Sequence, residues 1–174
     1  MRTVWHRIPI CGPDAPRPLR AAKHMTPTVH VRADVLGMIV AHARRAYPME
    51  CCGLLLGHRV DERCEIKRIM ESPNIAEGDR RVSYQVDWGV LLEATKASRS
   101  AAEGIIGFYH SHPEGPGEPS QTDQRDAWLD HSYLIVAYPR NAHPEATCWR
   151  WTGDPPRRVR ELVEVDESDS GERR

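Results

Sequence analysis

The segment Gly104–Asp123 constrains the fold of this chain more than any other. It opens with an apolar run, Gly-Ile-Ile-Gly-Phe-Tyr, that is partly β-branched or aromatic and is bounded by glycine and proline, which predicts a strand. Side chains two residues apart on a strand share a face, so His110 and His112 should point the same way, in line with Ile106 and Phe108. Two imidazoles side by side can bind one metal ion.

A seven-residue connection rich in proline and glycine leads from His112 to Ser120-Gln-Thr-Asp123. This tetrapeptide predicts a helix N-terminus, with Ser120 as the N-cap and Asp123 at the third helical position, and it would bring Asp123 back toward the histidines. Taken singly, a His-x-His pair is more often solvated, and such a capping box usually marks only a helix start. Together they supply two imidazoles and one carboxylate, the protein ligands of a catalytic zinc that keeps its fourth position for water.

Length, charge and cysteine content restrict the possible classes of protein. A chain of 174 residues suits one domain with a proper core, and a net charge of -1 argues against nucleic acid or an anionic membrane surface as partner. Five cysteines without a Cys-x-x-Cys pair, and no secretory apolar region, indicate a reducing compartment, with the cytoplasm as default. No apolar run approaches the roughly 18 to 20 residues needed to cross a bilayer.

The two ends of the chain differ in composition from its middle. Residues 1–28 scatter prolines among arginines and small residues without any period, which predicts a flexible extension. Its arginines faintly suggest a transit peptide, but the prolines oppose an amphipathic helix, and Met25 is an alternative start. Residues 166–174 are charged and lack apolar side chains, which predicts a disordered tail. One folded domain is therefore expected over residues 29–165.

Within that domain, helices and strands are interspersed. Apolar spacing predicts a helix over 34–46 with Asp34 as its N-cap and His42 on its solvated side. A second helix should follow Asp87 as N-cap, with Leu92 on or near its packed face. Strands are predicted at 50–57, 63–70, 81–87, 104–109, 133–138, 146–152 and 158–165. This order indicates an α/β fold in which helices pack on a mixed sheet.

Glu50 stands at the start of the apolar run Cys-Cys-Gly-Leu-Leu-Leu-Gly. A carboxylate at the mouth of a buried strand is costly unless the protein uses it. The other interpretation is an exposed last residue of the preceding loop, and the residues alone leave both open. Cys51 and Cys52 are interpreted as small buried hydrophobes, because no base lies beside them in sequence.

With these residues in view, the chain resembles the JAMM (MPN-plus) zinc metallopeptidases. The pattern of that family is an upstream Glu, His-x-His, seven residues, Ser, two residues and Asp. Glu50, His110-Ser-His112, Ser120 and Asp123 match every position. The chain is similar in particular to the short bacterial single-domain branch, which resembles sulfur-carrier-protein/cysteine hydrolases. The resemblance covers roughly residues 29–165 and implies a mixed β-sheet with flanking helices, as in the cytidine-deaminase-like proteins.

The resemblance also implies the chemistry. Zn²⁺ bound by His110, His112 and Asp123 would bring the pKa of water at its fourth position to about 7. Glu50 would take the proton and deliver it to the leaving amine. Ser120 would donate a hydrogen bond to the oxyanion, a contribution of about 3 to 4 kcal/mol. Because its hydroxyl is also the expected cap, we expect that it cannot fully serve both roles.

The implied substrate is an amide or isopeptide bond after the C-terminal Gly-Gly of a small ubiquitin-like sulfur-carrier protein, such as a carrier-cysteine adduct. Short loops without a large insertion between Glu50 and His110 favour this compact partner over polyubiquitin. One alternative is a deubiquitinase-like isopeptidase that removes ubiquitin-like modifiers from protein lysines. Another is a non-catalytic MPN scaffold, although such relatives lack the metal ligands that are present here. The oligomeric state stays open.

Two further points concern residues around the motif. His143-Pro-Glu matches only the first half of the deaminase zinc pattern, so His143 is interpreted as a turn residue. Groups that orient metal-bound imidazoles usually lie just behind them, and Ser111, Tyr109 and Asp126 are the nearby candidates.

Overall fold

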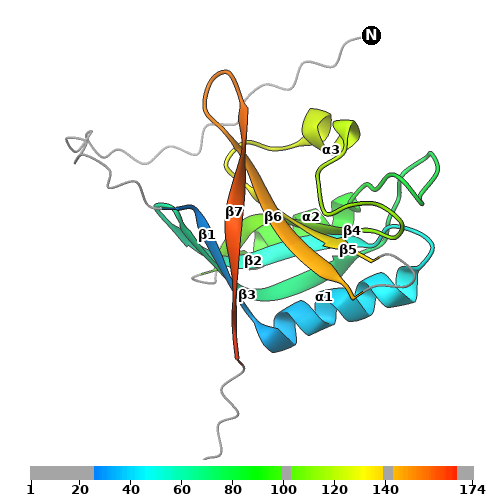
Figure 1. The fold of residues 1–174 in the computed structure, drawn as a ribbon, viewed down its shortest axis with the longest axis horizontal. Coiled ribbons are helices and arrows are strands. Elements are labelled where there is room, and N and C mark those ends of the chain that lie inside the picture. Colours follow the sequence, from blue (N-terminus) through cyan, green and yellow to red (C-terminus); the bar gives the residue numbers. More distant parts are fainter. Residues whose placement is uncertain (1–25, 99–102, 139–142, 168–174) are drawn as a thin grey trace, which may run out of the picture.

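A computed structural model describes residues 26–98, 103–138 and 143–167, and within them one mixed sheet forms the centre of the molecule (Figure 1). The helices are α1 (Ala33–Ala46), α2 (Trp88–Ser98) and α3 (Gln121–Asp126). The strands are β1 (Thr28–Arg32), β2 (Cys52–Val60), β3 (Arg63–Ser72), β4 (Gly104–His112), β5 (Ser132–Ala137), β6 (Glu145–Thr152) and β7 (Arg157–Asp166).

The sheet closes on itself in the order β1-β3-β2-β4-β5-β6-β7. Strand β2 pairs antiparallel with β3 and β4, and β4 pairs in parallel with β5. Closure comes from β1, which pairs in parallel with both β3 and β7. The predicted mixed α/β sheet with helices is therefore confirmed, whereas the barrel closure was not predicted. The finer relationship to the cytidine-deaminase-like proteins stays a prediction.

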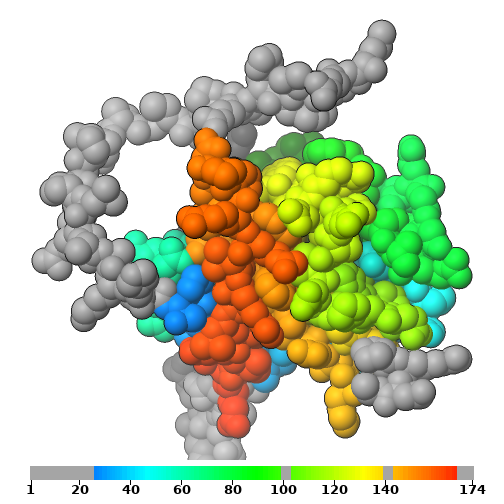
Figure 2. Space-filling model, turned by 45° about the horizontal axis from the view of Figure 1, so that its top comes forward, coloured from blue at the N-terminus to red at the C-terminus, as the bar shows by residue number. Residues whose placement is uncertain are grey.

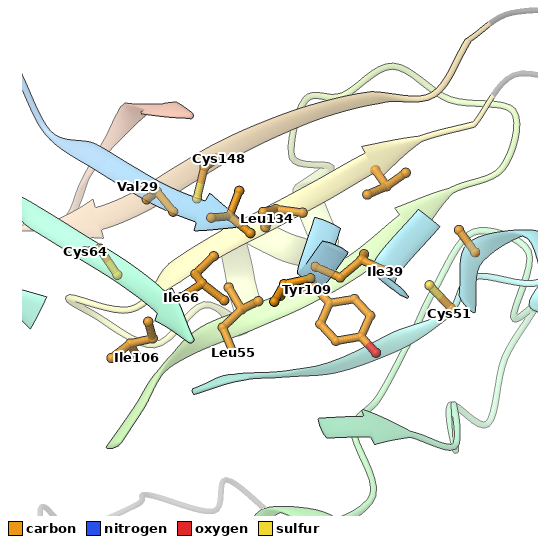
Figure 3. Close-up of a cluster of buried hydrophobic side chains, with 14 residues drawn as sticks. Val29, Ile39, Cys51, Leu55, Cys64, Ile66, Ile106, Tyr109, Leu134 and Cys148 are labelled. Atoms are coloured by element: carbon orange, nitrogen blue, oxygen red, sulfur yellow. The ribbon is translucent and has the colours of Figure 1, made fainter. Parts of the chain in front are cut away.

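Two core clusters lie on opposite faces of the strands, as the alternation along β2 and β5 requires. Leu55 and Leu134 belong to the cluster that packs against Val35, Ile39 and Ala43 of α1. Figure 3 shows Ile39 of α1 beside Tyr109 of β4 within this cluster. On the other face Leu54, Leu56 and Ile135 belong to a cluster that includes Ala94 of α2. The central strands are thus covered on both sides.

The start of α1 differs from the prediction. Its N-cap is Arg32, which makes no side-chain capping bond, so Asp34 is not the N-cap. Asp34 instead lies in the first turn, where its carboxylate accepts hydrogen bonds from the Arg32 guanidinium and from the backbone N–H of Val35. The solvated position expected for His42 is also wrong, because the side chain is only 14% exposed and its Nδ1 lies 2.9 Å from the hydroxyl of Tyr109.

Residues 81–87 do not form the predicted strand, and only an isolated bridge joins Val86 to Asn74. The amide of Asn74 explains the difference. It donates to the carbonyls of Glu50 and Ser83, 3.0 Å away in each case, and its oxygen accepts from the N–H of Gln85 at 3.1 Å. A side chain thus satisfies backbone groups that a neighbouring strand would otherwise bind.

Asp87 caps α2 as predicted, because its Oδ1 accepts from the N–H groups of Gly89 and Val90 at 2.8 and 3.2 Å. The packed position of Leu92 is wrong, since 55% of that residue is exposed. The helix is short and buries a narrow face around Ala94.

Strand β4 contains a bulge that the sequence pattern does not reveal. Gly107 pairs with Leu55 and Ile105 with Leu56, which leaves Ile106 without a partner on β2. An extra residue reverses the alternation beyond it, so Ile106 faces the α1 cluster while Phe108 faces the α2 cluster. The prediction that Ile106 shares a face with Phe108 is therefore wrong.

The predicted extension over 1–28 and tail over 166–174 fall mostly outside the described residues. Of the described positions in them, Thr28 belongs to β1 and Asp166 to β7. Within the described parts of the chain, no helix is both long and apolar enough to span a bilayer.

The contact between β4 and β5 gives a test of the packing. A Cβ built on Gly107 would lie 2.0 Å from the backbone oxygen of Ser132, whereas one on Gly104 meets no heavy atom within 4 Å. We expect Gly107→Ala to lower the free energy of unfolding by about 3 kcal/mol, because β4 must move away from β5. Gly104→Ala, in the same strand, should change it by less than about 0.5 kcal/mol. Urea denaturation of both variants measures the difference, and equal losses would refute the close-approach argument.

Candidate metal centre

The end of β4 and the first turn of α3 bring three polar side chains together. His110 and His112 come from β4, Asp123 from α3, and all three are buried. Their ligating atoms lie within 4.8 Å of one another. The two Nε2 atoms are 3.1 Å apart, Oδ1 of Asp123 lies 3.5 Å from Nε2 of His110, and Oδ2 of Asp123 lies 3.5 Å from Nε2 of His112. The structure thus brings together the three residues that the sequence spacing predicts as metal ligands.

These distances fit a zinc ion. Tetrahedral zinc with bonds of about 2.0–2.2 Å holds its ligand atoms about 3.3–3.5 Å apart, close to the separations among His110, His112 and Asp123. Burial lowers the pKa of His110, so this imidazole is neutral and offers a lone pair. Two imidazoles and a carboxylate leave the fourth position of such an ion open, as in catalytic sites.

The tautomer of His112 is set by the loop that follows it. Its Nδ1 lies 2.7 Å from the carbonyl oxygen of Pro116. A carbonyl can only accept, so Nδ1 carries the proton and Nε2 presents its lone pair to the cluster. The candidates Ser111, Tyr109 and Asp126 form their hydrogen bonds elsewhere, with a backbone N–H, with an imidazole of α1 and with a neighbouring arginine. Sequence reasoning missed Pro116 because a main-chain carbonyl has no residue signature.

His110 is oriented differently. The ring of Tyr84 stacks on its imidazole with centroids 4.3 Å apart and planes 20° apart. Its Nδ1 is buried and has no hydrogen-bond partner among the described residues. Tyr84 was not among the predicted site residues, because it falls in the segment assigned to a strand.

The charges of the cluster favour a cation. Burial alone would raise the pKa of Asp123, yet hydrogen bonds to His110 and His112 hold it well below its ordinary value, so the carboxylate is ionised. Burial would likewise lower the pKa of His112, but Asp123 and the Pro116 carbonyl raise it. A second proton, at Nε2 of His112, and the positive charge it gives the ring are therefore stabilised. A metal ion bound to the Nε2 lone pair of the neutral ring can take the place of that proton.

Glu50 is not the exposed loop residue of the second interpretation, since it is only 5% exposed. Its backbone N–H donates to the carbonyl of Arg80 at 2.7 Å, and its own carbonyl accepts from Asn74, which fixes the chain just before β2. Burial raises the pKa of Glu50 to about 7, with His112 lowering it and Asp123 raising it further. A carboxyl group with such a pKa can both take and return a proton near neutral pH.

Ser120 caps α3 as predicted. Its Oγ accepts from the N–H of Asp123 at 3.2 Å, and its own N–H donates to Asp123 Oδ2 at 2.7 Å. As a cap the hydroxyl only accepts, so its proton stays free to donate. The cap bond by itself therefore does not prevent the hydroxyl from donating a second hydrogen bond.

A groove of about 370 Å³ adjoins the cluster at Asp123. Trp88 and Trp128, which are 61% and 46% exposed, are among its lining residues. Tyr84, Phe108 and Tyr133 also line it, together with aliphatic and polar side chains such as Leu91 and Thr122. A substrate segment of extended, partly apolar chain can lie in a groove of this kind.

A buried neutral imidazole, an ionised carboxylate and a buried carboxyl group with a raised pKa are residue types that occur together in metal-dependent hydrolase sites. Comparison with known proteins agrees: residues 32–152 match the family described as prokaryotic homologs of the JAB domain. The chain belongs to this family, which confirms the resemblance to the JAMM peptidases.

Individual relatives extend over most of the chain. It is 35% identical over 137 residues to the desampylase of Haloferax volcanii, covering 76% of this chain and 94% of that protein. It is 33% identical over 113 residues to the CysO-cysteine peptidase of Mycobacterium tuberculosis, covering 65% and 75%. A solved structure from Desulfitobacterium hafniense superimposes with a TM-score of 0.71 at 27% identity, covering 81% and 94%.

Metal binding can be tested with histidine variants. We expect the wild type to bind about one zinc ion per chain, and His110→Ala to bind almost none, because one of three protein ligands is lost. His143→Ala removes an exposed imidazole outside the cluster and should retain the metal. Elemental analysis after gel filtration measures the ratio. A His110→Ala protein that keeps its zinc would show that the ion binds elsewhere.

Proposed function

We propose that this protein is a zinc metallopeptidase that hydrolyses the amide or isopeptide bond after the C-terminal Gly-Gly of a small ubiquitin-like sulfur-carrier protein, such as a carrier-cysteine adduct. The observation that carries the proposal is the buried His110, His112 and Asp123 cluster with the buried carboxyl group of Glu50 held at a pKa of about 7. A non-catalytic scaffold would have no use for such a costly arrangement.

Each residue of the site has one task in this reaction. His110, His112 and Asp123 hold the zinc ion, which when bound supplies Lewis acidity and brings the pKa of water at its open position to about 7. Glu50 accepts the proton of the attacking water and returns it to the leaving nitrogen. The free hydroxyl proton of Ser120 donates to the carbonyl oxygen as negative charge develops there. The groove beyond Asp123 holds the residues that flank the scissile bond.

The shape of the approach supports a small carrier. Between Glu50 and His110 the described segments are β2, β3, the connection that carries Tyr84, α2 and the first part of β4, and no large inserted element is among them. A thin Gly-Gly tail can reach a buried centre along such a groove, because glycine adds no side chain to clear. The names of the two relatives, desampylase and CysO-cysteine peptidase, also support a small-protein conjugate as substrate.

Four cysteines of the described residues are free and buried, which supports a reducing compartment such as the cytoplasm. Burial raises the pKa of Cys51 to about 11 and of Cys52 to about 12, and it also raises the pKa of Cys64 and Cys148, so these thiols are protonated at neutral pH and are poor nucleophiles.

The activity is tested with zinc-loaded protein and a Gly-Gly-ending carrier that bears either a C-terminal cysteine or a lysine isopeptide. We expect release of the carrier, measured by mass spectrometry in single turnover. Glu50→Gln should slow it by about 100-fold or more while zinc content stays unchanged, because only the proton carrier is removed. No release from any such carrier would overturn the proposed substrate class. Much faster cleavage of the lysine isopeptide would favour the deubiquitinase-like alternative.

Ser120 gives a separate prediction. Ser120→Ala should lower kcat about 100- to 1,000-fold, because the oxyanion donor is lost. It should also lower the free energy of unfolding by about 1 kcal/mol through loss of the cap of α3. Ser120→Thr keeps a hydroxyl for both roles and is the matched control. If Ser120→Ala loses stability but keeps kcat, the residue is only a cap.

A further inference from the structure

The loop between His112 and Ser120 is held from outside the motif by strand β6. Thr147 Oγ1 donates a hydrogen bond to the carbonyl oxygen of Gly117. Trp149 Nε1 lies 3.0 Å from the same oxygen and 3.0 Å from Thr147 Oγ1. Both side chains are buried, at 5% and 8% exposure. Figure 2 shows the loop and α3 segment alongside β6 and β7 on one face of the molecule.

This contact lies one residue away from the group that orients the metal ligand. The carbonyl of Pro116 accepts from Nδ1 of His112, and the next carbonyl along the chain, that of Gly117, is the one that β6 binds. Peptide units are planar, so only the two backbone dihedrals of Gly117 separate the two carbonyls. Glycine restricts these dihedrals least of all residues. The orientation of the Pro116 carbonyl therefore needs an external contact.

Gly117 itself is explained by the same contact. A Cβ on it would lie 2.9 Å from Thr147 Cγ2 and 3.2 Å from Thr147 Oγ1. The loop can approach β6 closely only because Gly117 has no side chain. The lack of a side chain also leaves the backbone of Gly117 unrestricted, so its conformation depends on the contact with Thr147. Arg158 and Arg160 of β7 place their guanidinium groups over the Trp149 ring, 4.8 and 5.5 Å from its centroid, and these contacts help to hold the indole in place.

We propose that Thr147, together with Trp149, is a positioning residue of the metal centre: it anchors the 116–117 backbone so that the Pro116 carbonyl holds His112 with Nε2 toward the ion. The proposal rests on the proposed function only in requiring that the cluster binds a metal. It predicts that a hydroxyl on β6, remote from the ligand atoms in sequence, contributes to metal affinity.

The test separates positioning from packing. Thr147→Val keeps nearly the same volume and removes only the hydroxyl, and Thr147→Ser restores it. Thr152→Val makes the same change at the opposite end of β6 and is the matched control. The dissociation constant for zinc is measured by chelator competition, and the absorption spectrum of the cobalt-substituted protein reports ligand geometry. Melting temperatures of the metal-free proteins report structural damage.

We expect Thr147→Val to raise the zinc dissociation constant about 10- to 100-fold and to change the cobalt spectrum. In other metalloproteins, mutation of the groups that orient a metal-binding side chain weakens metal binding by a similar factor. Thr147→Ser and Thr152→Val should resemble the wild type. An unchanged dissociation constant and spectrum in Thr147→Val would overturn the proposal. If that variant is too unstable in the metal-free form, Trp149→Phe, which removes the other donor to Gly117, must show the same loss of affinity or the proposal fails. All of these readouts work without substrate, so a wrong assignment of the carrier leaves them unaffected.

Discussion

Burial of the Asp123 carboxylate beside two imidazoles is the constraint on which the rest of the structure depends. Removing three such polar groups from water costs several kcal/mol unless they bind one another, a backbone partner or a cation. The chain meets that cost locally with the hydrogen bonds between Ser120 and Asp123 and from His112 to Pro116. Strand β4 can deliver the imidazoles there because it is central, paired with β2 and β5 along most of its length.

Features governed by neighbouring residues could be predicted from the sequence. The capping box at Ser120 and the strand that carries His110 and His112 depend on short-range rules, and the structure has both. The meeting of Asp123 with the imidazoles also followed from spacing, because only one loop separates them. The buried position of Glu50 needed more, since the groups that act on its pKa, His112 and Asp123, lie more than sixty residues further along the chain and residue type alone could not exclude an exposed position.

Features governed by distant partners could not be predicted. Closure of the barrel depends on pairing of β1 with β7, whose residues Thr28 and Leu162 lie far apart in sequence. The failed strand at 81–87 depends on hydrogen bonds of the Asn74 side chain, and alternating apolar residues carry no trace of that competitor. The contact of Gly117 with β6 is of the same kind. Sequence spacing therefore identifies the metal ligands more readily than the groups that position them.

The two ends of the paired strands β4 and β5 show how the cluster differs from an ordinary buried polar network. Near the start of β5, the buried Glu161 carboxylate is paired within the chain: Arg59 lies 3.1 Å away, Arg150 3.3 Å, and Ser132 donates at 2.5 Å. That charge is neutralised by the protein itself.

Near the end of the parallel neighbour β4, the Asp123 carboxylate is also buried, yet among the described residues no lysine or arginine pairs with it. Its partners are the imidazoles of His110 and His112 and the N–H of Ser120. Burial keeps His110 neutral, so this imidazole adds no positive charge to the cluster. The carboxylate and the two imidazoles could therefore stabilise more positive charge than the protein itself supplies. A divalent cation supplies that charge and uses the lone pairs that the buried imidazoles present, which is why this end of the barrel is suited to zinc and the Glu161 end is not.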